Sequence, residues 1–319
     1  MLIPKGKLIA IGGNEDKGSE NEPDYIQRNN LNFFNLQILG KFKKELGKED
    51  PRIEVISSAS KIPYEIGEIY HEAFTKLGCT NVESMHIKNP EDAQKTEFIE
   101  RIKQADGVLF TGGNQLRLST IYGESEILNI LKRRYLEEES FIIAGTSAGA
   151  MAMSDTMIYR GSSAESLLKG EVKVTNGLGL INNVVIDTHF VTRGRFGRLA
   201  QAVATNPLLI GVGLADDTGV IISGGNNLEA IGSGLVIIVD GFEMMHTNIT
   251  EIREGSPIAI ENLIVHVMAR GNHYDLSKRK FEAKSLAPSA SEIEKEINYK
   301  KQHNSNNNGH TGENPASEH

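Results

Sequence analysis

Short apolar runs alternate with segments of helical periodicity through the first two thirds of the 319-residue chain. The runs have the length of buried strands, whereas apolar residues in the segments between them recur at helical spacing. Strands are predicted at residues 7–13, 52–60, 81–87, 107–113 and 141–145. Helices are predicted at residues 31–46, 64–78, 90–105 and 114–139, and another follows the last strand. This alternation requires crossover connections, so it predicts an α/β fold with a mostly parallel sheet.

A different pattern begins near residue 183. A strand is predicted at 183–190 and a helix at 193–207. Residues 210–241 hold three predicted strands joined by tight glycine and asparagine turns, which are typical of antiparallel hairpins. Residues 263–281 are expected to add one or two strands. We therefore expect antiparallel hairpin strands to close one edge of the sheet.

The two polar regions of the chain are interpreted differently. A short helix is predicted at 289–297, and almost nothing apolar follows from Lys301 onward. Such a segment cannot bury enough surface to order itself, so we expect a single α/β domain over residues 1–300 and a disordered tail over 301–319. Residues 15–30 are polar and irregular, which predicts a surface loop able to act as a lid.

Composition excludes several classes of protein. The net charge is −8, and we find no basic stripe of the kind that binds nucleic acid. No apolar run approaches the roughly 20 residues needed to span a bilayer, and the first residues do not resemble a signal peptide. Cys79 is the one cysteine, so no disulfide can form within the chain. We expect a soluble cytoplasmic protein with no membrane or nucleic-acid partner.

The segment from Gly145 to Gly149 carries the strongest chemical signal. Gly145, Ser147 and Gly149 form the pattern G-x-S-x-G directly after a predicted buried strand. A nucleophile at a strand-to-helix turn needs small neighbours, and the following helix directs its N–H groups at the reaction centre. Ser147 is therefore the predicted nucleophile, and the N–H of Ala148 is the first oxyanion donor. The alternatives are a close-packed turn or a phosphate-binding helix start.

A second glycine turn follows the strand predicted at 107–113. Gly112 and Gly113 precede a helix, and such turns gather at the carboxyl ends of parallel strands, where ligands bind. We expect an N–H of this turn, at Gly113, to supply the second oxyanion donor and Gln115 to face the same crevice. A plain glycine turn is the alternative. The Gly12–Gly13 turn also permits a nucleotide site, but neither a G-x-G-x-x-G nor a Walker pattern is present.

His189 is the best candidate for a general base. It ends the strand predicted at 183–190, close to Asp187, and a group of arginines follows it. A guanidinium among them can bind a substrate carboxylate through two parallel hydrogen bonds. The alternative is that these arginines form salt bridges at a helix start. They are Arg193, Arg195 and Arg198.

A histidine base works best when a carboxylate orients it. Asp216 and Asp217 lie together between two predicted strands, and the pattern cannot choose between them. The alternative is an Asx turn. The order of serine, histidine and acid along the chain differs from that of α/β-hydrolases.

Several stretches resemble the cyanophycinases, serine exopeptidases of peptidase family S51. These stretches are IAIGGNEDK, FTGGNQLRL, AGTSAGA, DTHFVTRGRFGRL, GVGLADDTGVII and EAIGSGLVIIVDG. They fall in the family's order and cover residues 7–276. The resemblance implies a doubly wound, flavodoxin-like sheet with helices on both faces, related to class I glutamine amidotransferases. It also implies a homodimer with no metal or cofactor.

The implied reaction is cleavage of cyanophycin, an aspartate polymer with β-linked arginine, into β-Asp-Arg dipeptides. Ser147 matches the family's nucleophile and His189 its base, while Asp216 stands where the family usually carries glutamate. The positions tied to substrate binding in the family are matched by Gln115, Asp187, Arg193 and Arg198.

The chain departs from the family at several of these positions. Thr188 replaces a usual glutamine, Ala215 and Asp216 replace a usual acidic pair, and Asn114 stands where aspartate is common. These changes concern specificity for the β-Asp-Arg unit more than the reaction type. The competing interpretations are an α-aspartyl dipeptidase or other isoaspartyl peptidase of the same family, a non-catalytic amidotransferase-like binding protein, and a nucleotide-binding protein.

Overall fold

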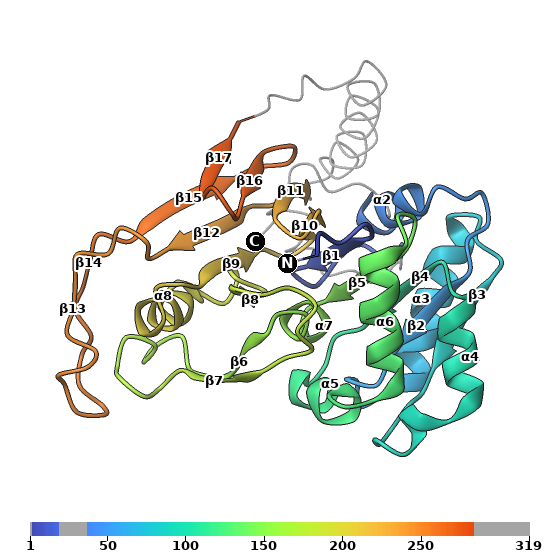
Figure 1. The fold of residues 1–319 in the computed structure, drawn as a ribbon, viewed down its shortest axis with the longest axis horizontal. Helices are drawn as coiled ribbons and strands as arrows, with labels where there is room; N and C mark the ends of the chain where they lie inside the picture. Colours follow the sequence, from blue (N-terminus) through green and yellow to red (C-terminus); the bar gives the residue numbers. More distant parts are fainter. Residues whose placement is uncertain (1, 19–36, 284–319) are drawn as a thin grey trace, which may run out of the picture. The chain divides into compact units, whose positions relative to one another are not determined.

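Five parallel strands form one side of a nine-stranded sheet in the computed structural model, which describes residues 2–18 and 37–283 (Figure 1). In space they follow the order β3-β2-β4-β5-β1. The strands β2 to β5 keep the order of the first four strands of a flavodoxin-like sheet, and β1 lies at the end of this series, beside β5. The five are β1 (Lys7–Ile11), β2 (Ile53–Ile56), β3 (Val82–Met85), β4 (Gly107–Phe110) and β5 (Ile142–Thr146).

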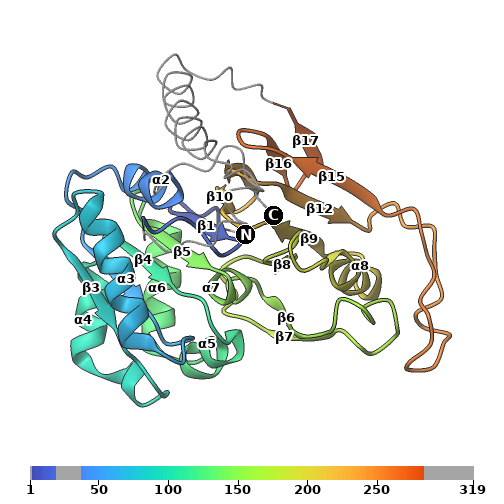
Figure 2. The same ribbon diagram turned by 180° about the vertical axis from the view of Figure 1, so that it is seen from behind.

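Helices cover both faces of these strands. Side chains that alternate along β1 separate two hydrophobic clusters, because successive residues of a strand point to opposite faces. Ile9 and Ile11 pack with α2 (Gln37–Leu46) and α3 (Pro63–Lys76), whereas Leu8 and Ala10 belong to the cluster on the other face. That face carries η1 (Asp92–Gln94), α4 (Thr96–Gln104), α5 (Gln115–Tyr122) and α6 (Glu126–Glu137). Figures 1 and 2 show α6 and α3 on opposite sides of the strands.

The first sheet continues beyond β1 with antiparallel strands. β10 (Thr218–Ser223) pairs with β1, and β11 (Asn227–Gly232), β16 (His273–Asp275) and β17 (Lys280–Glu282) follow in that order. The predicted α/β class, with a mostly parallel sheet and antiparallel hairpin strands at one edge, is confirmed.

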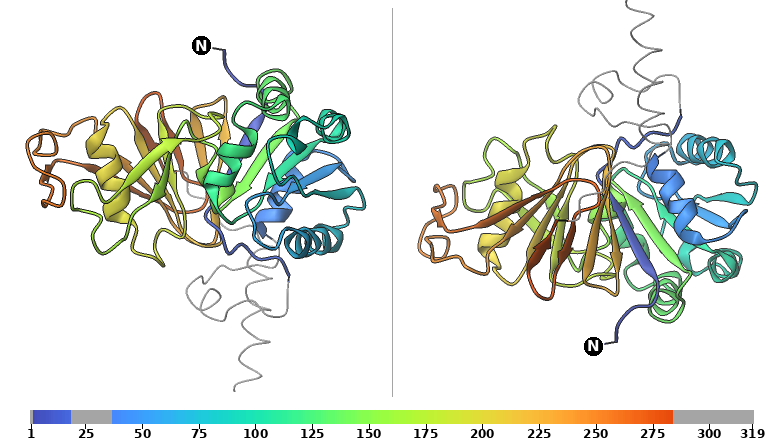
Figure 3. Two further views of the ribbon diagram at one scale, coloured as in Figure 1. Left: turned by 90° about the horizontal axis from the view of Figure 1, so that it is seen from below. Right: turned by 90° about the horizontal axis from the view of Figure 1, so that it is seen from above.

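The prediction of three strands in residues 210–241 is wrong, because four strands form there. β10 and β11 join the first sheet, whereas β9 (Ile210–Leu214) and β12 (Val236–Asp240) belong to a second, four-stranded sheet. That sheet has the order β15-β12-β9-β8 and includes β8 (Val184–Asp187) and β15 (Ile264–Met268). Residues 263–281 hold three strands rather than one or two. Figure 3 shows this strand-rich part, coloured yellow to orange, beside the helix-flanked strands in blue to green.

Smaller elements complete the second part of the fold. α8 (Phe196–Thr205) packs on the second sheet, and a Cβ atom at Gly211 of β9 would lie 2.6 Å from Leu199 of this helix. Two hairpins were not predicted. They are β6 (Thr156–Arg160) with β7 (Lys173–Asn176), and β13 (His246–Thr247) with β14 (Ile260–Glu261).

Glycine and serine break the long helical segment predicted at 114–139 into two helices. α5 ends at Tyr122, and α6 begins after Ser125, whose Oγ accepts a hydrogen bond from the N–H of Leu128 at 3.1 Å. A serine that bonds the free N–H groups of the first turn favours a helix start at that point. The segment predicted at 90–105 is likewise divided into η1 and α4.

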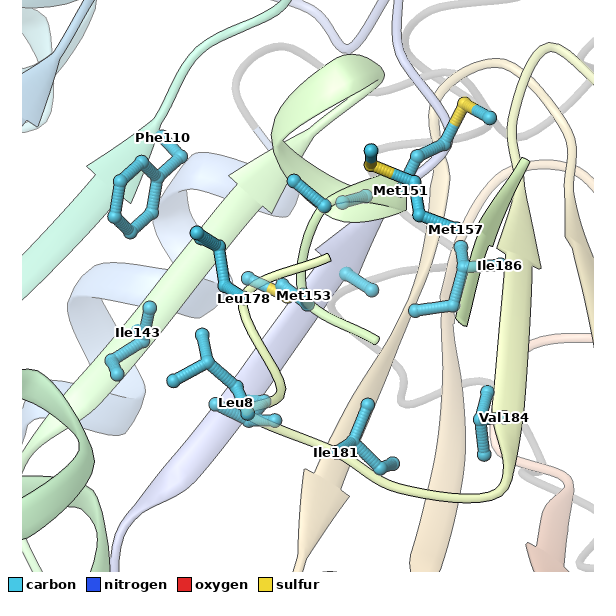
Figure 4. Packing of buried hydrophobic residues seen from close by; sticks show 14 of the residues in the cluster. Leu8, Phe110, Ile143, Met151, Met153, Met157, Leu178, Ile181, Val184 and Ile186 are labelled. Atoms are coloured by element: carbon cyan, nitrogen blue, oxygen red, sulfur yellow. The ribbon is translucent and has the colours of Figure 1, made fainter. Parts of the chain in front are cut away.

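The two halves of the described chain meet around a short helix, α7 (Ala148–Met151). Figure 4 shows Met151 and Met157 lying between α7 and β8, beside Ile186, with Phe110 and Ile143 on the other side of the cluster. These side chains are almost fully buried. This packing holds the turn before α7 in place between the two sheets.

Some predictions fall outside the described residues. They are the helix at 289–297, the domain boundary near residue 300, the tail at 301–319, the start of the helix at 31–46, and residues 19–30 of the expected lid. Within residues 2–18 and 37–283, none of the helices has the length and apolar character needed to cross a bilayer.

Candidate active site

The carboxyl ends of several strands meet at one place. β1 and β5 are parallel and pair Ile11 with Thr146, so the turns after them are neighbours. β10 runs antiparallel to β1 and pairs Gly219 with Ile11, which brings the turn before β10 to the same edge. The end of β8 joins them through a hydrogen bond from the N–H of His189 to the carbonyl oxygen of Gly12, at 2.9 Å. Ser147, His189 and Asp216 are thereby brought together.

The glycines around Ser147 are required by close backbone contacts. A Cβ atom at Gly149 would lie 2.3 Å from the carbonyl oxygen of Phe110, and one at Gly145 would lie 2.6 Å from the backbone of Gly149. Ser147 itself has a φ of 51° and donates its N–H to Ile11 at 2.9 Å. A positive φ at a non-glycine residue is strained, and such strain is typical of a nucleophile turn. The predicted serine turn therefore has the expected geometry.

His189 lies within hydrogen-bond distance of the serine. Its Nε2 is 2.9 Å from the Oγ of Ser147. A Cβ atom at Gly13 would lie 2.3 Å from the Cε1 of His189, so only glycine leaves room for the imidazole here. His189 has a φ of 49°, and its side chain is almost fully buried.

Asp216 is hydrogen-bonded to this histidine. Its Oδ1 lies 2.5 Å from the Nδ1 of His189 and also accepts a hydrogen bond from the Nδ2 of Asn14 at 3.2 Å. A carboxylate can only accept, so Nδ1 carries the proton and Nε2 is left free to accept from Ser147. Burial alone would raise the pKa of Asp216, but the hydrogen bond from His189 and the charges of His189 and Arg193 outweigh it and lower the pKa.

Asp217 points away from His189. The structure therefore distinguishes Asp217 from Asp216, whereas the sequence pattern could not choose between them as the partner of His189. It accepts a hydrogen bond from the N–H of Asp16 and pairs with the hydroxyl of Ser233. Burial raises its pKa to about 7, and the nearby charges of Glu15 and Asp16 act in the same direction. Asp217 makes no contact with His189 among the described residues.

The pKa of Asp217 predicts a pH-dependent stability. The folded value is about 7 against an ordinary value of 3.8, so the folded state binds the proton more tightly than the unfolded state. The stabilisation is complete below the ordinary value and is lost as pH rises through the folded one. Relative to Asp217→Asn, the wild type should lose about 3 kcal/mol of unfolding free energy between pH 5 and pH 8. Urea unfolding of both proteins at several pH values measures this, and parallel curves would contradict it.

Backbone N–H groups surround the space next to Ser147. The N–H groups of Gly112, Gly113 and Ala148 donate to no acceptor among the described residues. A Cβ atom at Gly112 would lie 3.4 Å from the Cβ of Ser147, which places this turn beside the predicted nucleophile. At Gly113, whose φ is 142°, a Cβ atom would lie 2.1 Å from the carbonyl oxygen of Ala59. Ala148 and the glycine turn thus leave N–H groups without an acceptor, among the described residues, next to the serine.

Asp187 and Arg198 do not face an open crevice. Asp187 is fully buried, and Arg198 is 6% exposed. The Oδ2 of Asp187 lies 3.0 Å from the Nε of Arg198, and its Oδ1 lies 3.0 Å from the Nη1 of Arg195. Burial raises the pKa of Asp187, and the two guanidinium groups oppose that rise. This arrangement is the salt-bridge alternative, so it favours a role in positioning His189 over direct substrate contact for these two residues.

Arg193 and Gln115 are placed differently. The side chain of Arg193 is exposed and forms no ion pair within the described part of the chain, and it remains the arginine available to a substrate. The amide of Gln115 is partly buried and donates to the carbonyl oxygen of Ile158 at 2.9 Å.

Sequence reasoning missed a polar network behind the triad. Glu15 is buried and accepts hydrogen bonds from the hydroxyl of Tyr70 and, at 2.6 Å, from the Oγ1 of Thr146. Burial alone would raise the pKa of Glu15, but Lys17 and these hydrogen bonds lower it. The expected surface loop therefore does not begin at Glu15. The available signal was polar residues directly after the Gly12–Gly13 turn, at the carboxyl end of the first strand.

The described residues hold no group of three or more histidine, cysteine or acidic side chains placed to bind a metal ion. They do hold the hydroxyl of Ser147, the imidazole of His189 and the carboxylate of Asp216 in one hydrogen-bonded line. Backbone N–H groups without an acceptor among the described residues lie beside the hydroxyl. This set can form and hydrolyse an acyl group on Ser147.

Comparison with known proteins agrees with this chemistry. A family model described as peptidase family S51 matches residues 30–229, which include Ser147, His189 and Asp216. A cyanophycinase of Synechococcus elongatus is 34% identical over 284 residues, covering 89% of this chain and 83% of the relative. A cyanophycinase of Trichormus variabilis is 34% identical over 275 residues, covering 86% and 87%.

A solved structure supports the fold. The crystal structure of a peptidase from an acI-B1 Actinobacterium matches with a TM-score of 0.51 and 20% identity. The match covers 83% of this chain and 98% of that chain. At this identity the likeness concerns the fold alone. The family model and the cyanophycinase relatives, by contrast, carry the assignment, and the chain belongs to peptidase family S51.

Proposed function

We propose that the chain is a serine exopeptidase that hydrolyses cyanophycin to β-Asp-Arg dipeptides through an acyl-enzyme on Ser147. Relatives named cyanophycinase at 34% identity support the substrate. The observation that carries the reaction is the hydrogen-bonded line from Ser147 through His189 to Asp216, with distances of 2.9 and 2.5 Å.

The geometry supplies each proton transfer of the reaction. The Oγ of Ser147 attacks the scissile carbonyl carbon while its proton passes to the Nε2 of His189. The imidazolium is stabilised by Asp216 and gives that proton to the leaving amine as the peptide bond breaks. Water then attacks the ester, its proton passes to His189, and Ser147 recovers a proton when the acid product leaves.

The negative charge that develops on the carbonyl oxygen needs hydrogen-bond donors close to that oxygen. We assign this role to the N–H of Ala148 and the N–H of Gly113, which have no acceptor among the described residues. Donors fixed in the backbone before the reaction stabilise an oxyanion without reorganising.

Arg193 is the proposed carboxylate ligand. Replacing it with methionine keeps most of the apolar stem and removes the charge. Loss of a hydrogen bond to a charged group costs about 1.5–3 kcal/mol, so kcat/KM should fall about 10- to 100-fold, mainly through KM. Steady-state kinetics of Arg193→Met measure this. A fall confined to kcat would contradict a binding role. Arg160→Met, an exposed arginine on β6, is the matched control.

Mass spectrometry of the products tests the proposed function. Purified cyanophycin is incubated with the wild type, and the Ser147→Ala variant serves as the blank. Release of β-Asp-Arg by the wild type alone supports the proposal. Cleavage of Asp-X or isoaspartyl dipeptides, without attack on the polymer, supports the dipeptidase alternative. Absence of product from both proteins on every substrate supports a non-catalytic binding protein.

We also propose that the chain acts as a homodimer in the cytoplasm. The likeness to cyanophycinases supports the dimer, and the lone, buried Cys79 fits a reducing compartment. Light scattering after gel filtration measures the oligomeric state, and a monomer at micromolar concentration would contradict the first part.

A further inference from the structure

A hollow of about 460 Å³ lies beside the proposed active site, and the mechanism above leaves it unused. It is formed by the start of α3 and the loop before it, by the loop after β3, and by α5. The lining side chains that matter here are Ser60, Lys61, Tyr64, Glu65, Lys88 and Arg117.

Backbone contacts connect this hollow to the nucleophile. Gly112 approaches Ser147, and the next residue, Gly113, packs against the backbone of Ala59 and Ser60. A Cβ atom at Gly113 would lie 2.8 Å from the backbone nitrogen of Ser60, which lines the hollow. Asn114 also donates its N–H to Ala59 at 2.9 Å. The glycine turn that offers an oxyanion donor therefore also borders the hollow.

The hollow is cationic, although the chain as a whole has a net charge of −8. Lys61, Lys88 and Arg117 line it against the single carboxylate of Glu65. Arg117 is fixed by a hydrogen bond from its Nε to the carbonyl oxygen of Ser58 at 2.9 Å. None of these four charged side chains forms an ion pair within the described part of the chain. Unpaired cations that converge on a hollow favour an anionic ligand group.

An exposed aromatic ring completes the hollow. Tyr64 is 58% exposed, and its ring centroid lies 5.5 Å from the Nζ of Lys88 and 4.2 Å from that of the His86 ring. His86 is in turn held by the Oγ of Ser57 at 2.9 Å. The ring is thus supported from behind while much of its surface stays open. A guanidinium stacks favourably on such a ring, and Glu65 follows it directly in the chain.

We propose that this hollow binds a second arginyl unit of the polymer, away from the bond that is cut; this inference rests on the proposed function. When arginine is attached through its α-amine to an aspartate β-carboxyl, its carboxylate and guanidinium remain free. Lys61, Lys88 and Arg117 bind the carboxylate, while Tyr64 and Glu65 bind the guanidinium. The polymer repeats this pair of groups many times, so holding a unit beyond the two that flank the scissile bond raises the local concentration of the chain at Ser147.

Kinetics on two substrates test the inference. The double variant Lys61→Gln/Lys88→Gln is compared with wild type on cyanophycin and on two linked β-Asp-Arg units that contain one scissile bond. We expect KM for the polymer to rise about 10-fold, the equivalent of about 1.4 kcal/mol, with kcat and the short substrate changing less than twofold. Equal effects on both substrates, or no effect on the polymer, would overturn the inference. The double variant Lys44→Gln/Lys280→Gln, two exposed lysines on α2 and β17, is the matched control.

A binding measurement separates this inference from the proposed function. Sedimentation with insoluble cyanophycin is measured for Ser147→Ala alone and for Ser147→Ala combined with Lys61→Gln/Lys88→Gln. About 10-fold weaker binding of the combined variant supports the hollow as a polymer site, whatever the wild type hydrolyses. Equal binding of the two overturns the hollow while release of β-Asp-Arg by the wild type still supports the function. No binding by either, with no product from the wild type, overturns both.

Discussion

Replacing Ser147 with alanine should lower kcat by about 10⁶-fold, because the acyl-enzyme can no longer form. Residual hydrolysis would come only from the N–H donors of Ala148 and the glycine turn and from substrate binding. The change removes a single oxygen from a partly exposed side chain, so the fold should persist. Product release measured by mass spectrometry gives the rate, and unfolding by urea checks stability.

A control and a second readout make this result specific to the nucleophile. Ser119→Ala changes a serine on α5 whose Oγ bonds, within the described part of the chain, only the carbonyl oxygen of Leu116, and it should leave kcat within twofold. A fluorophosphonate reagent should add one covalent group to the wild type and none to Ser147→Ala. Labelling of both proteins, or retention of more than about 1% of the rate by Ser147→Ala, would move the nucleophile elsewhere.

Replacing Asp216 with asparagine should lower kcat by about 10⁴-fold. The amide nitrogen can donate to Nδ1 of His189, which favours the tautomer that carries its proton on Nε2. That tautomer cannot accept the proton of Ser147. The imidazolium formed in the reaction also loses the charge that lies 2.5 Å away in the wild type. The side chain keeps its size, so substrate binding should change little and KM should stay within a few-fold.

Asp217→Asn is the matched control for Asp216→Asn. Asp217 is adjacent in the chain, equally buried, and turned toward Ser233 and the N–H of Asp16. Its raised pKa means that the acid is largely protonated below pH 7, a state that asparagine imitates. We expect a large loss of kcat for Asp216→Asn and a small one for Asp217→Asn. A reversed order would assign the orienting acid to Asp217.

The buried network around Glu15 shows how the fold can fix the relative positions of Ser147, His189 and Asp216. The turn after β1 contributes Asn14 to Asp216, Gly13 to the space of the His189 ring, and Glu15 to Thr146, which precedes Ser147. One turn therefore contacts Asp216, His189 and the residue before Ser147. Because side chains locked by packing and hydrogen bonds hold a catalytic geometry best, we expect this turn to set the relative positions of the three groups.

The sequence alone was informative where the determining contacts are local. The alternation of short apolar runs with helical periods predicted β1 to β5 and the helices between them, because each period depends on neighbouring residues. The serine turn was predicted for the same reason, since Gly145, Ser147 and Gly149 stand within five positions and follow a strand. Gly145 has a local cause, because a Cβ atom there would meet the backbone of Gly149, whereas Gly149 is required by the more distant backbone of Phe110.

Only the tertiary structure decided which distant segments pair. β9 and β12 are as apolar as β10 and β11, and nothing in their patterns indicates that two strands leave for a second sheet. Asp216 and Asp217 differ by one position, and only the turn between the sheets directs one carboxylate at His189 and the other at Ser233. The choice among arginines was also non-local, since burial against Asp187 removed Arg195 and Arg198 from the surface and left Arg193 exposed. Local periodicity thus determined the elements and indicated the proposed nucleophile, whereas long-range packing chose the partners of each charged group, because the energy of a charge depends on its surroundings in space.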